Sequence, residues 1–541
     1  MPDALNTTPN TATPGATPDL TPAKKAEAAW LIRLRSGLAL ALVLVFAFYG
    51  FLAVEESFKS WHFMSGDHHA GMVALRDRTD AGVDVRGSPE VDALAMPIWM
   101  KLMADRTDSA YSYGSDSLFE TAIYYTQMPA LNKVTLSFHM LLGGICMLLG
   151  GSQFWPGFRR RYPKLHRVAG MVFVVTAQAA MVLSIIYLVR TPVAETYGDL
   201  VFHVGLWFLA IGVTLALGMA MYHVWKRQIG QHQAWMGIAY GFLLTAPLLR
   251  YDWILLGMMF PDASMNEANY AGMMLLIPQS FLFGYILVCL NRWLSRERAT
   301  LQPLPWADAV RAALPDWLPV VGAVFVAFAV LTLHYYLVTP GLAGSELARQ
   351  LIPASVVANE ARVFAETSVA TTTFGLLAAA TLVLAPLFLF SAFTHDQSTT
   401  VFTRELHWLG LAVAVASGIV ALLALHFGYA LGAPSHATLS GGTFYLLMGG
   451  TGLAFALLLA QAVLRRRLAL VKEWGLFALL AVAMAPLFHA LVPVLGLFDI
   501  APQYIASGHV YLLAAGIAPA GLLVGFLYAI YGSATRERVA Y

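Results

Sequence analysis

The chain has 541 residues, of which 58% are hydrophobic and only 12% are charged. A soluble globular chain carries about twice that share of charge, so the composition excludes a soluble enzyme, a disordered scaffold and a coiled coil. The net charge of +2 argues against nucleic acid as a partner. The two cysteines, Cys146 and Cys289, exclude a disulfide framework, a covalent CxxCH haem site and a thiolate zinc site.

The sequence contains twelve apolar runs that are long enough to cross a membrane, which takes about 20 residues. They cover residues 30–54, 131–153, 165–189, 199–225, 232–259, 270–293, 315–338, 368–393, 402–431, 438–464, 473–498 and 503–531. Such continuous runs predict an all-α polytopic membrane protein whose main partner is the lipid bilayer, rather than a β-barrel. Kinks are expected at the prolines within them: Pro247, Pro278, Pro386, Pro486, Pro493 and Pro519.

The connections between the runs differ in charge in a regular way. Every second connection carries Lys or Arg, as at 159–167 and 465–472, whereas the short loops 191–198 and 432–437 carry none. Because basic loops stay in the cytoplasm, both termini are expected to be cytoplasmic. The remaining segments are assigned as a disordered cytoplasmic tail (1–29), outer segments (55–130 and 346–367) and a cytoplasmic linker (299–314).

The two halves of the chain look like copies of one unit. Trp235 and Pro247 recur as Trp474 and Pro486, 239 residues later, and further matches in the flanking spans have offsets of 240 and 241. A near-constant offset predicts two parallel six-helix repeats, at 30–298 and 315–541. The alternative is chance similarity among helices rich in Leu and Ala.

Four histidines of the first half lie at two depths. At 1.5 Å per residue, His139 lies about two turns inside its span from the outer face, and His203 about one turn inside from the same face. His166 and His232 each begin a span at the inner face. The four residues therefore form two pairs of equal depth.

Equal-depth pairs on facing helices are what a haem iron with two axial imidazoles requires. The pattern predicts an outer haem between His139 and His203 and an inner haem between His166 and His232, which together would carry electrons across the bilayer. Arg250 and Arg167 are expected to neutralise the outer and inner propionates. The alternative for the inner pair is a set of interfacial residues beside basic loops. No catalytic residue is assigned.

The first half also resembles a known family. The resemblance rests on His139, the run Tyr162-Pro163-Lys164-Leu165-His166-Arg167 with Gly170, His232 with Trp235-Met236, and Arg250. Over about residues 131–255 these features resemble the bacterial predicted-membrane-protein family known as domain of unknown function 2306. Where that family has His-Arg, this chain has His232-Gln233, which removes one cation. The resemblance implies a multi-pass protein of the bacterial inner membrane, but the family label implies no activity.

The histidine arrangement is also similar to that of two-haem transmembrane cytochromes. That similarity implies haem b, ligation by histidine alone, and electron transfer with a quinol or a redox partner protein. Two other functions stay open: a secondary transporter, which also has twelve helices in two halves, and a non-catalytic assembly or sensor protein.

The second half keeps a histidine at only one of the four positions, His407, which corresponds to His166. Several others gather near the outer face: His334, His426, His489 and His509, with His436 in the adjoining loop. His426, His489 and His509 could bind copper, zinc or haem, bond a quinone, or bond neighbouring carbonyls. His223 is expected to be a solvated inner-face residue, and the histidines of 61–69 to lie in a solvated loop.

Overall fold

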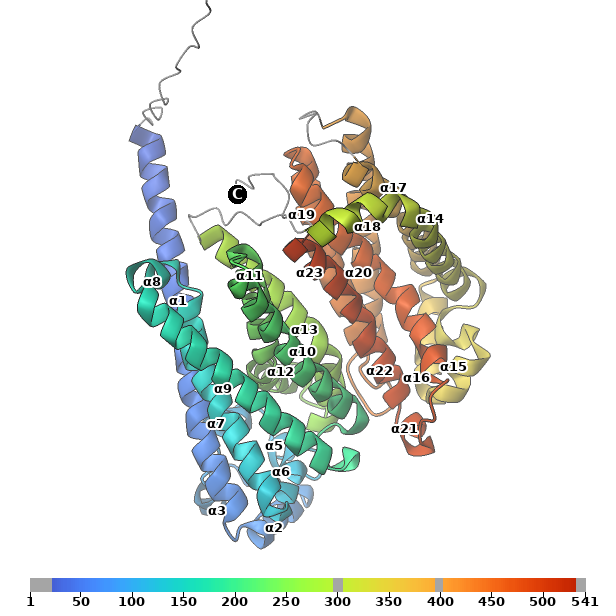
Figure 1. Cartoon of the computed structure of the whole chain (residues 1–541). Coiled ribbons are helices and arrows are strands. Elements are labelled where there is room, and N and C mark those ends of the chain that lie inside the picture. The colour runs from blue at the N-terminus through green and yellow to red at the C-terminus, as the bar shows by residue number, and fades with distance from the viewer. Residues whose placement is uncertain (1–21, 295–304, 395–401, 532–541) are drawn as a thin grey trace, which may run out of the picture.

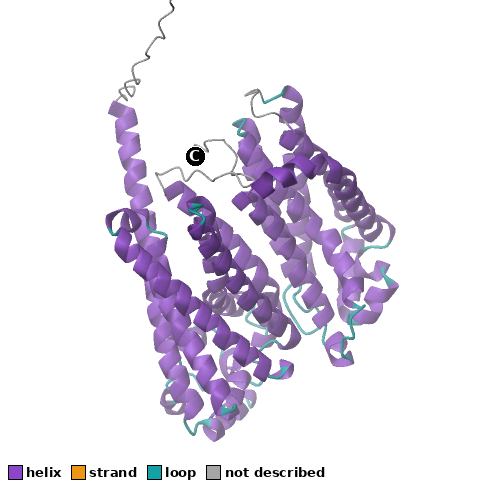
Figure 2. Cartoon of the chain, viewed as in Figure 1, coloured by secondary structure: helices purple, strands orange, loops and turns teal. Residues whose placement is uncertain are grey.

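The computed structural model describes residues 22–294, 305–394 and 402–531. Over these ranges every regular element is a helix, apart from an isolated bridge between Ser435 and Leu439 (Figure 2). Eleven of the described helices are long and apolar enough to cross a membrane, and a bent pair makes a twelfth span. The predicted all-α membrane fold is therefore confirmed.

The first half forms one side of the molecule (Figure 1). Its long helices are α1 (Pro22–Ser65), α7 (Ala130–Gln153), α9 (Pro163–Arg190), α10 (Asp199–Trp225), α11 (Ile229–Leu243), α12 (Thr245–Met259) and α13 (Met265–Leu294). A short helix, α8 (Pro156–Arg161), connects α7 to α9. Helix α1 begins within the expected disordered tail, of which residues 1–21 lie outside the described part.

The fifth span is broken between α11 and α12, which meet at an angle of 42°. Helix α11 ends at Leu243, four residues before Pro247. A proline has no N–H to offer the carbonyl of the residue four positions earlier, and its ring would collide with that carbonyl. The kink expected at Pro247 is therefore present.

Residues 66–129 form a helical cap on the first half rather than an open loop. The cap comprises α2 (His69–Asp80), α3 (Pro89–Ala93), α4 (Ile98–Ala104), α5 (Ser109–Tyr113) and α6 (Leu118–Gln127). It has its own apolar core, to which Met72, Met96 and Phe119 each contribute a fully buried side chain. Burial of this core keeps the cap folded.

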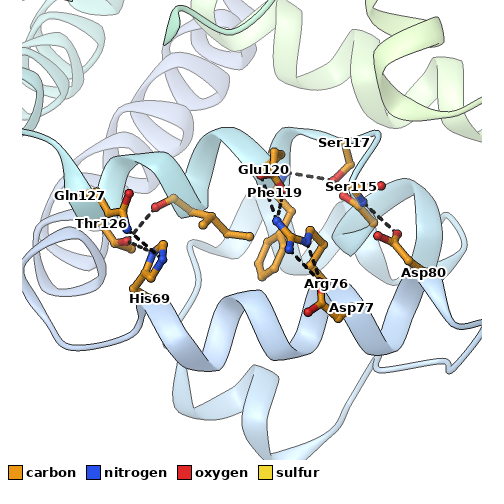
Figure 3. Close-up of polar contacts among 12 residues, drawn as sticks. His69, Arg76, Asp77, Asp80, Ser115, Ser117, Phe119, Glu120, Thr126 and Gln127 are labelled. Atoms are coloured by element: carbon orange, nitrogen blue, oxygen red, sulfur yellow. Dashed lines mark hydrogen bonds and ion pairs between the residues drawn. The ribbon is translucent and has the colours of Figure 1, made fainter.

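Polar contacts fasten α2 to α6 (Figure 3). Arg76 Nη1 lies 2.9 Å from Glu120 Oε2. His69 Nδ1 lies 3.1 Å from Thr126 Oγ1, and Gln127 Nε2 lies 2.9 Å from His69 Nε2. Both ring nitrogens of His69 are thus engaged within the cap, so the expected solvated loop is wrong for this histidine.

The second half forms the other side of the molecule (Figure 1). Its elements are α14 (Pro305–Leu333), a π-helical turn (His334–Val338), η3 (Gly341–Gly344), α15 (Glu346–Leu351), α16 (Ala354–Glu366), α17 (Ser368–Thr394), α18 (Arg404–Leu431), α19 (Thr443–Leu464), α20 (Leu468–Leu495), α21 (Pro502–Ala506), α22 (His509–Ile517), η4 (Ala518–Gly521) and α23 (Leu522–Tyr531). Helix α14 begins at Pro305, where a linker to residue 314 was expected. The rest of that linker lies outside the described residues.

Matching turns follow α10 and α19. Arg227 and Arg466 have φ of 59° and 51°, in the left-handed region. In the first turn the backbone N–H of Gln228 donates to the carbonyl oxygen of His223 over 2.8 Å. In the second turn the backbone N–H of Arg467 donates to the carbonyl oxygen of Ala462 over 2.9 Å. Both turns obey the 239-residue offset, which supports the predicted repeat.

The two halves exchange a similar contact in both directions. Trp235 Nε1 of α11 donates to the hydroxyl of Tyr531 in α23 over 2.8 Å. Trp474 Nε1 of α20 donates to the hydroxyl of Tyr285 in α13 over 3.0 Å. In each case a tryptophan of one half binds a tyrosine on the last helix of the other half, although the two tyrosines are 246 residues apart rather than 239 to 241.

The turns after α7, α10 and α19 and the last turn of α13 lie at one end of the bundle, which we call the basic end because these segments contain Arg159, Arg227, Arg292 and Arg465. Helix α1 begins and α23 ends at this end (Figure 1). The cap lies at the opposite end. The assignment of the basic end to the cytoplasm stays a prediction from the positive-inside rule.

Candidate functional site

A cavity of about 990 Å³ opens at the basic end of the first half. Its polar lining comes from α7, α8, α9, α11, α13 and the turn after α10: Gln153, Arg159, Arg160, His166, Arg167, Arg227, His232, Gln233 and Asn291. The structure thus brings together His166, His232 and Arg167, the three residues predicted for the inner haem. No Asp or Glu is among the lining residues, so the cavity favours an anion.

His232 is held in one orientation by a backbone bond. Its Nδ1 lies 3.0 Å from the carbonyl oxygen of Ala220 in α10. Since a carbonyl can only accept, Nδ1 carries the hydrogen, and the neutral ring keeps its lone pair on Nε2. A backbone acceptor on the far nitrogen is the usual way in which proteins orient a histidine that binds a metal.

His166 lies in the first turn of α9 and has an unsatisfied hydrogen-bonding atom. Its Nδ1 is buried and has no hydrogen-bond partner among the described residues. Its ring contacts Phe158 edge-on, with 6.4 Å between the ring centroids. A buried polar atom without a partner costs about 1–3 kcal/mol, which a bound group could recover.

A chain of amides orients one of the arginines. Arg159 Nη1 donates to Asn291 Oδ1 over 3.0 Å, and Asn291 Nδ2 donates to Gln233 Oε1 over 3.1 Å. The Gln233 amide thus belongs to the network around Arg159, while Arg160, Arg167 and Arg227 supply further positive charge to the lining.

The outer pair is arranged differently. His139 Nδ1 donates to the carbonyl of Ala180 over 2.9 Å. His203 has both nitrogens engaged: Trp207 Nε1 donates to its Nε2 over 3.2 Å, and its Nδ1 lies 3.2 Å from Thr196 Oγ1. In the described part of the chain no hydrogen bond or ring contact joins His139 to His203.

Arg250 is already paired. Its Nη2 lies 2.7 Å from Glu56 Oε1, and its guanidinium lies 5.2 Å from the ring centroid of Trp99. Trp99 Nε1 also donates to Glu56 Oε1, over 3.0 Å. Arg250, the predicted partner of the outer propionates, is thus already paired with the buried carboxylate of Glu56, which lies just beyond the first apolar run (30–54).

The three histidines singled out in the second half lie in separate surroundings. His426 is exposed. His489 donates from Nδ1 to Ala485 O, with Nε2 3.9 Å from Glu360. His509 Nε2 is 4.0 Å from Asp199 Oδ2. Across the described ranges, no three His, Cys, Asp or Glu side chains are grouped as a metal site.

His223 corrects another expectation, because it is 1% exposed rather than solvated. Its Nδ1 lies 2.6 Å from Gln228 Oε1 and its Nε2 lies 3.0 Å from the Tyr531 hydroxyl. The sequence did not predict the contact between His223 and Tyr531, because the two residues are 308 positions apart. Arg159 and Arg227 were visible in the sequence only as markers of the inner face.

Comparison with known proteins identifies part of the first half. Residues 136–287 match the model of the family described as "Predicted membrane protein (DUF2306)", which confirms the resemblance expected over about residues 131–255. The matched segment contains both histidines and all four arginines of the cavity. No curated protein and no solved structure matches the chain. Fold and family together establish an integral membrane protein.

Proposed function

We propose that the cavity binds one b-type haem through His166 and His232, and that the protein transfers electrons in the bacterial inner membrane. The observation that carries the proposal is the shared cavity: two imidazoles, four arginines and no acidic side chain line one space of about 990 Å³. The electron donor or acceptor would be a quinol or a redox partner protein.

The lining residues fit what a haem b needs, which is two neutral nitrogen ligands, cations for two propionates and apolar walls. His232 offers Nε2, and its bond to Ala220 O fixes the orientation of the ring. His166 offers a buried nitrogen without a partner. When bound, the haem supplies one-electron chemistry, while the protein holds it and neutralises its carboxylates.

The proposal is limited to the inner position. An outer haem would need Nε2 of His203, which accepts the indole N–H of Trp207. It would also need Arg250, whose charge is matched by Glu56. Breaking a buried ion pair leaves an uncompensated charge and costs about 3–5 kcal/mol, so the inner cavity is the better supported site.

The test is a reduced-minus-oxidised optical spectrum of the full chain, purified after haem-supplemented expression. We expect a b-type spectrum from the wild type, and its loss from His166→Ala and from His232→Ala. His407→Ala is the matched control, because His407 occupies the repeat position of His166 but lies outside the cavity lining. A flat wild-type spectrum, or haem retained in both cavity variants, would overturn the proposal.

A phospholipid headgroup is the second candidate occupant. Basic pockets between helices on the cytoplasmic side bind anionic lipids, and Arg160 and Arg167 are both exposed lining residues. An anionic phospholipid retained by the wild type and lost from Arg159→Gln, together with a flat optical spectrum, would favour this occupant. Haem together with no retained lipid would exclude it.

A further inference from the structure

A hydroxyl from the second half reaches the helices that build the cavity. Tyr531, near the end of α23, accepts the indole N–H of Trp235 in α11 over 2.8 Å and lies 3.0 Å from His223 Nε2 in α10. Both helices contribute lining residues to the cavity. Tyr531 of the second half therefore contacts two of the helices that wall the cavity.

Chemistry fixes the direction of the hydrogen bonds. An amide oxygen can only accept, so His223 donates from Nδ1 to Gln228 Oε1 over 2.6 Å, and the neutral ring accepts at Nε2. The Tyr531 hydroxyl therefore donates to His223 Nε2, while its oxygen accepts the indole N–H of Trp235. The result is one continuous chain of donors from Trp235 to Gln228.

Gln228 connects this chain of hydrogen bonds to the turn beside the cavity. Its backbone N–H donates to His223 O over 2.8 Å, and its carbonyl accepts the N–H of His232 over 3.0 Å. Between His223 and His232 lies Arg227, in the left-handed conformation. Two lining residues, Arg227 and His232, are thus placed by the turn that the chain of hydrogen bonds holds.

We propose that Tyr531 is a positioning residue for the cavity, through which the second half sets the turn between α10 and α11. It acts through His223 and Gln228 and is not itself a lining residue. The expected effect on the haem rests on the proposed function, whereas the expected effect on the order of the turn does not depend on it.

The test compares Tyr531→Phe with the wild type, both as full chains. Phenylalanine keeps the ring that contacts His223 and Trp235, at centroid distances of 5.7 and 6.3 Å, and removes only the hydroxyl. We expect deuterium exchange at the amides of 226–232 to be about ten-fold faster, since one buried hydrogen-bond link is lost. If the wild type carries haem, its reduction potential should also shift.

Tyr285→Phe is the matched control, because it removes the reciprocal hydroxyl that accepts from Trp474. It should leave exchange at 226–232 unchanged. Gln228→Met breaks the same chain of hydrogen bonds at its other end and should also speed exchange at 226–232. It therefore tests the inference even if Tyr531→Phe does not fold. Wild-type exchange in folded Tyr531→Phe and Gln228→Met would overturn the inference. A wild type without haem would overturn the proposed function alone.

Discussion

Arg227 carries backbone strain next to the cavity. It occupies the position after a helix end where glycine is usual, and its φ of 59° is unfavourable for a residue with a side chain by about 1 kcal/mol. Arg466 has the same strain in the equivalent turn but does not line the cavity. Because Arg466 keeps the same strain away from the cavity, strain alone assigns no role to the Arg227 side chain, and the two positions make a matched pair for a test.

Replacing each of these arginines by glycine should separate strain from function. Arg227→Gly and Arg466→Gly are both expected to raise the free energy of unfolding by up to about 1 kcal/mol, because glycine accepts positive φ. Only Arg227→Gly should weaken retention of the cavity's anion. Thermal unfolding in detergent and the bound haem per protein measure the two effects. Equal retention in both variants would show that the Arg227 charge is not used.

At the scale of elements, a buried ion pair joins three helices around the cap. Glu56 near the end of α1 accepts from Arg250 in α12 and from Trp99 in α4. Glu56 is 7% exposed, so its charge depends on these partners rather than on water. The pair therefore fixes how the cap sits on the spans.

Arg250→Met should lower the free energy of unfolding by about 3–5 kcal/mol, because it leaves the Glu56 carboxylate buried without a cation. Adding Glu56→Gln to this variant should recover most of the loss, since the uncompensated charge is then gone. Denaturation midpoints of the wild type, both single variants and the double variant would complete the cycle. Additive losses would contradict the pairing.

At the scale of the whole molecule, the halves are also joined at the end opposite the basic end. His436 Nε2 of the second half lies 2.9 Å from Asp116 Oδ2 of the cap. Burial acts to raise the pKa of Asp116, but hydrogen bonds from Ser264, Asn266 and His436 outweigh it and hold the pKa below its ordinary value. This junction is therefore acid-sensitive.

Because the pKa of Asp116 is lower in the folded state, it adds stability above its unfolded pKa of about 4, and that stability is lost as the pH falls through the folded value. The carboxylate is partly exposed, so screening keeps the effect within about 1 kcal/mol. Unfolding of the wild type and Asp116→Asn should thus differ most near neutral pH and converge below about pH 4. A constant difference would refute the assignment.

The span positions and the inner histidine pair were predictable, because both depend on residues counted along a helix. His166 and His232 start their helices at one face, and the cavity contains both. The partners were not predictable, since hydrogen bonds such as Tyr531 to His223 join positions that are distant in sequence. The cap was missed because its core is assembled from helices of 5 to 12 residues, too short for a clear pattern.

The tryptophan–tyrosine contact, made once in each direction, ties each half to the last helix of the other. Within one polypeptide, one half can change at positions that line a cavity in the other while its surface still supports that other half. Position 471, which lies 239 residues after His232, is Val, yet the Tyr531 hydroxyl of the same half bonds Trp235 and His223 beside the cavity. The second half thus braces the wall of a cavity that belongs to the first.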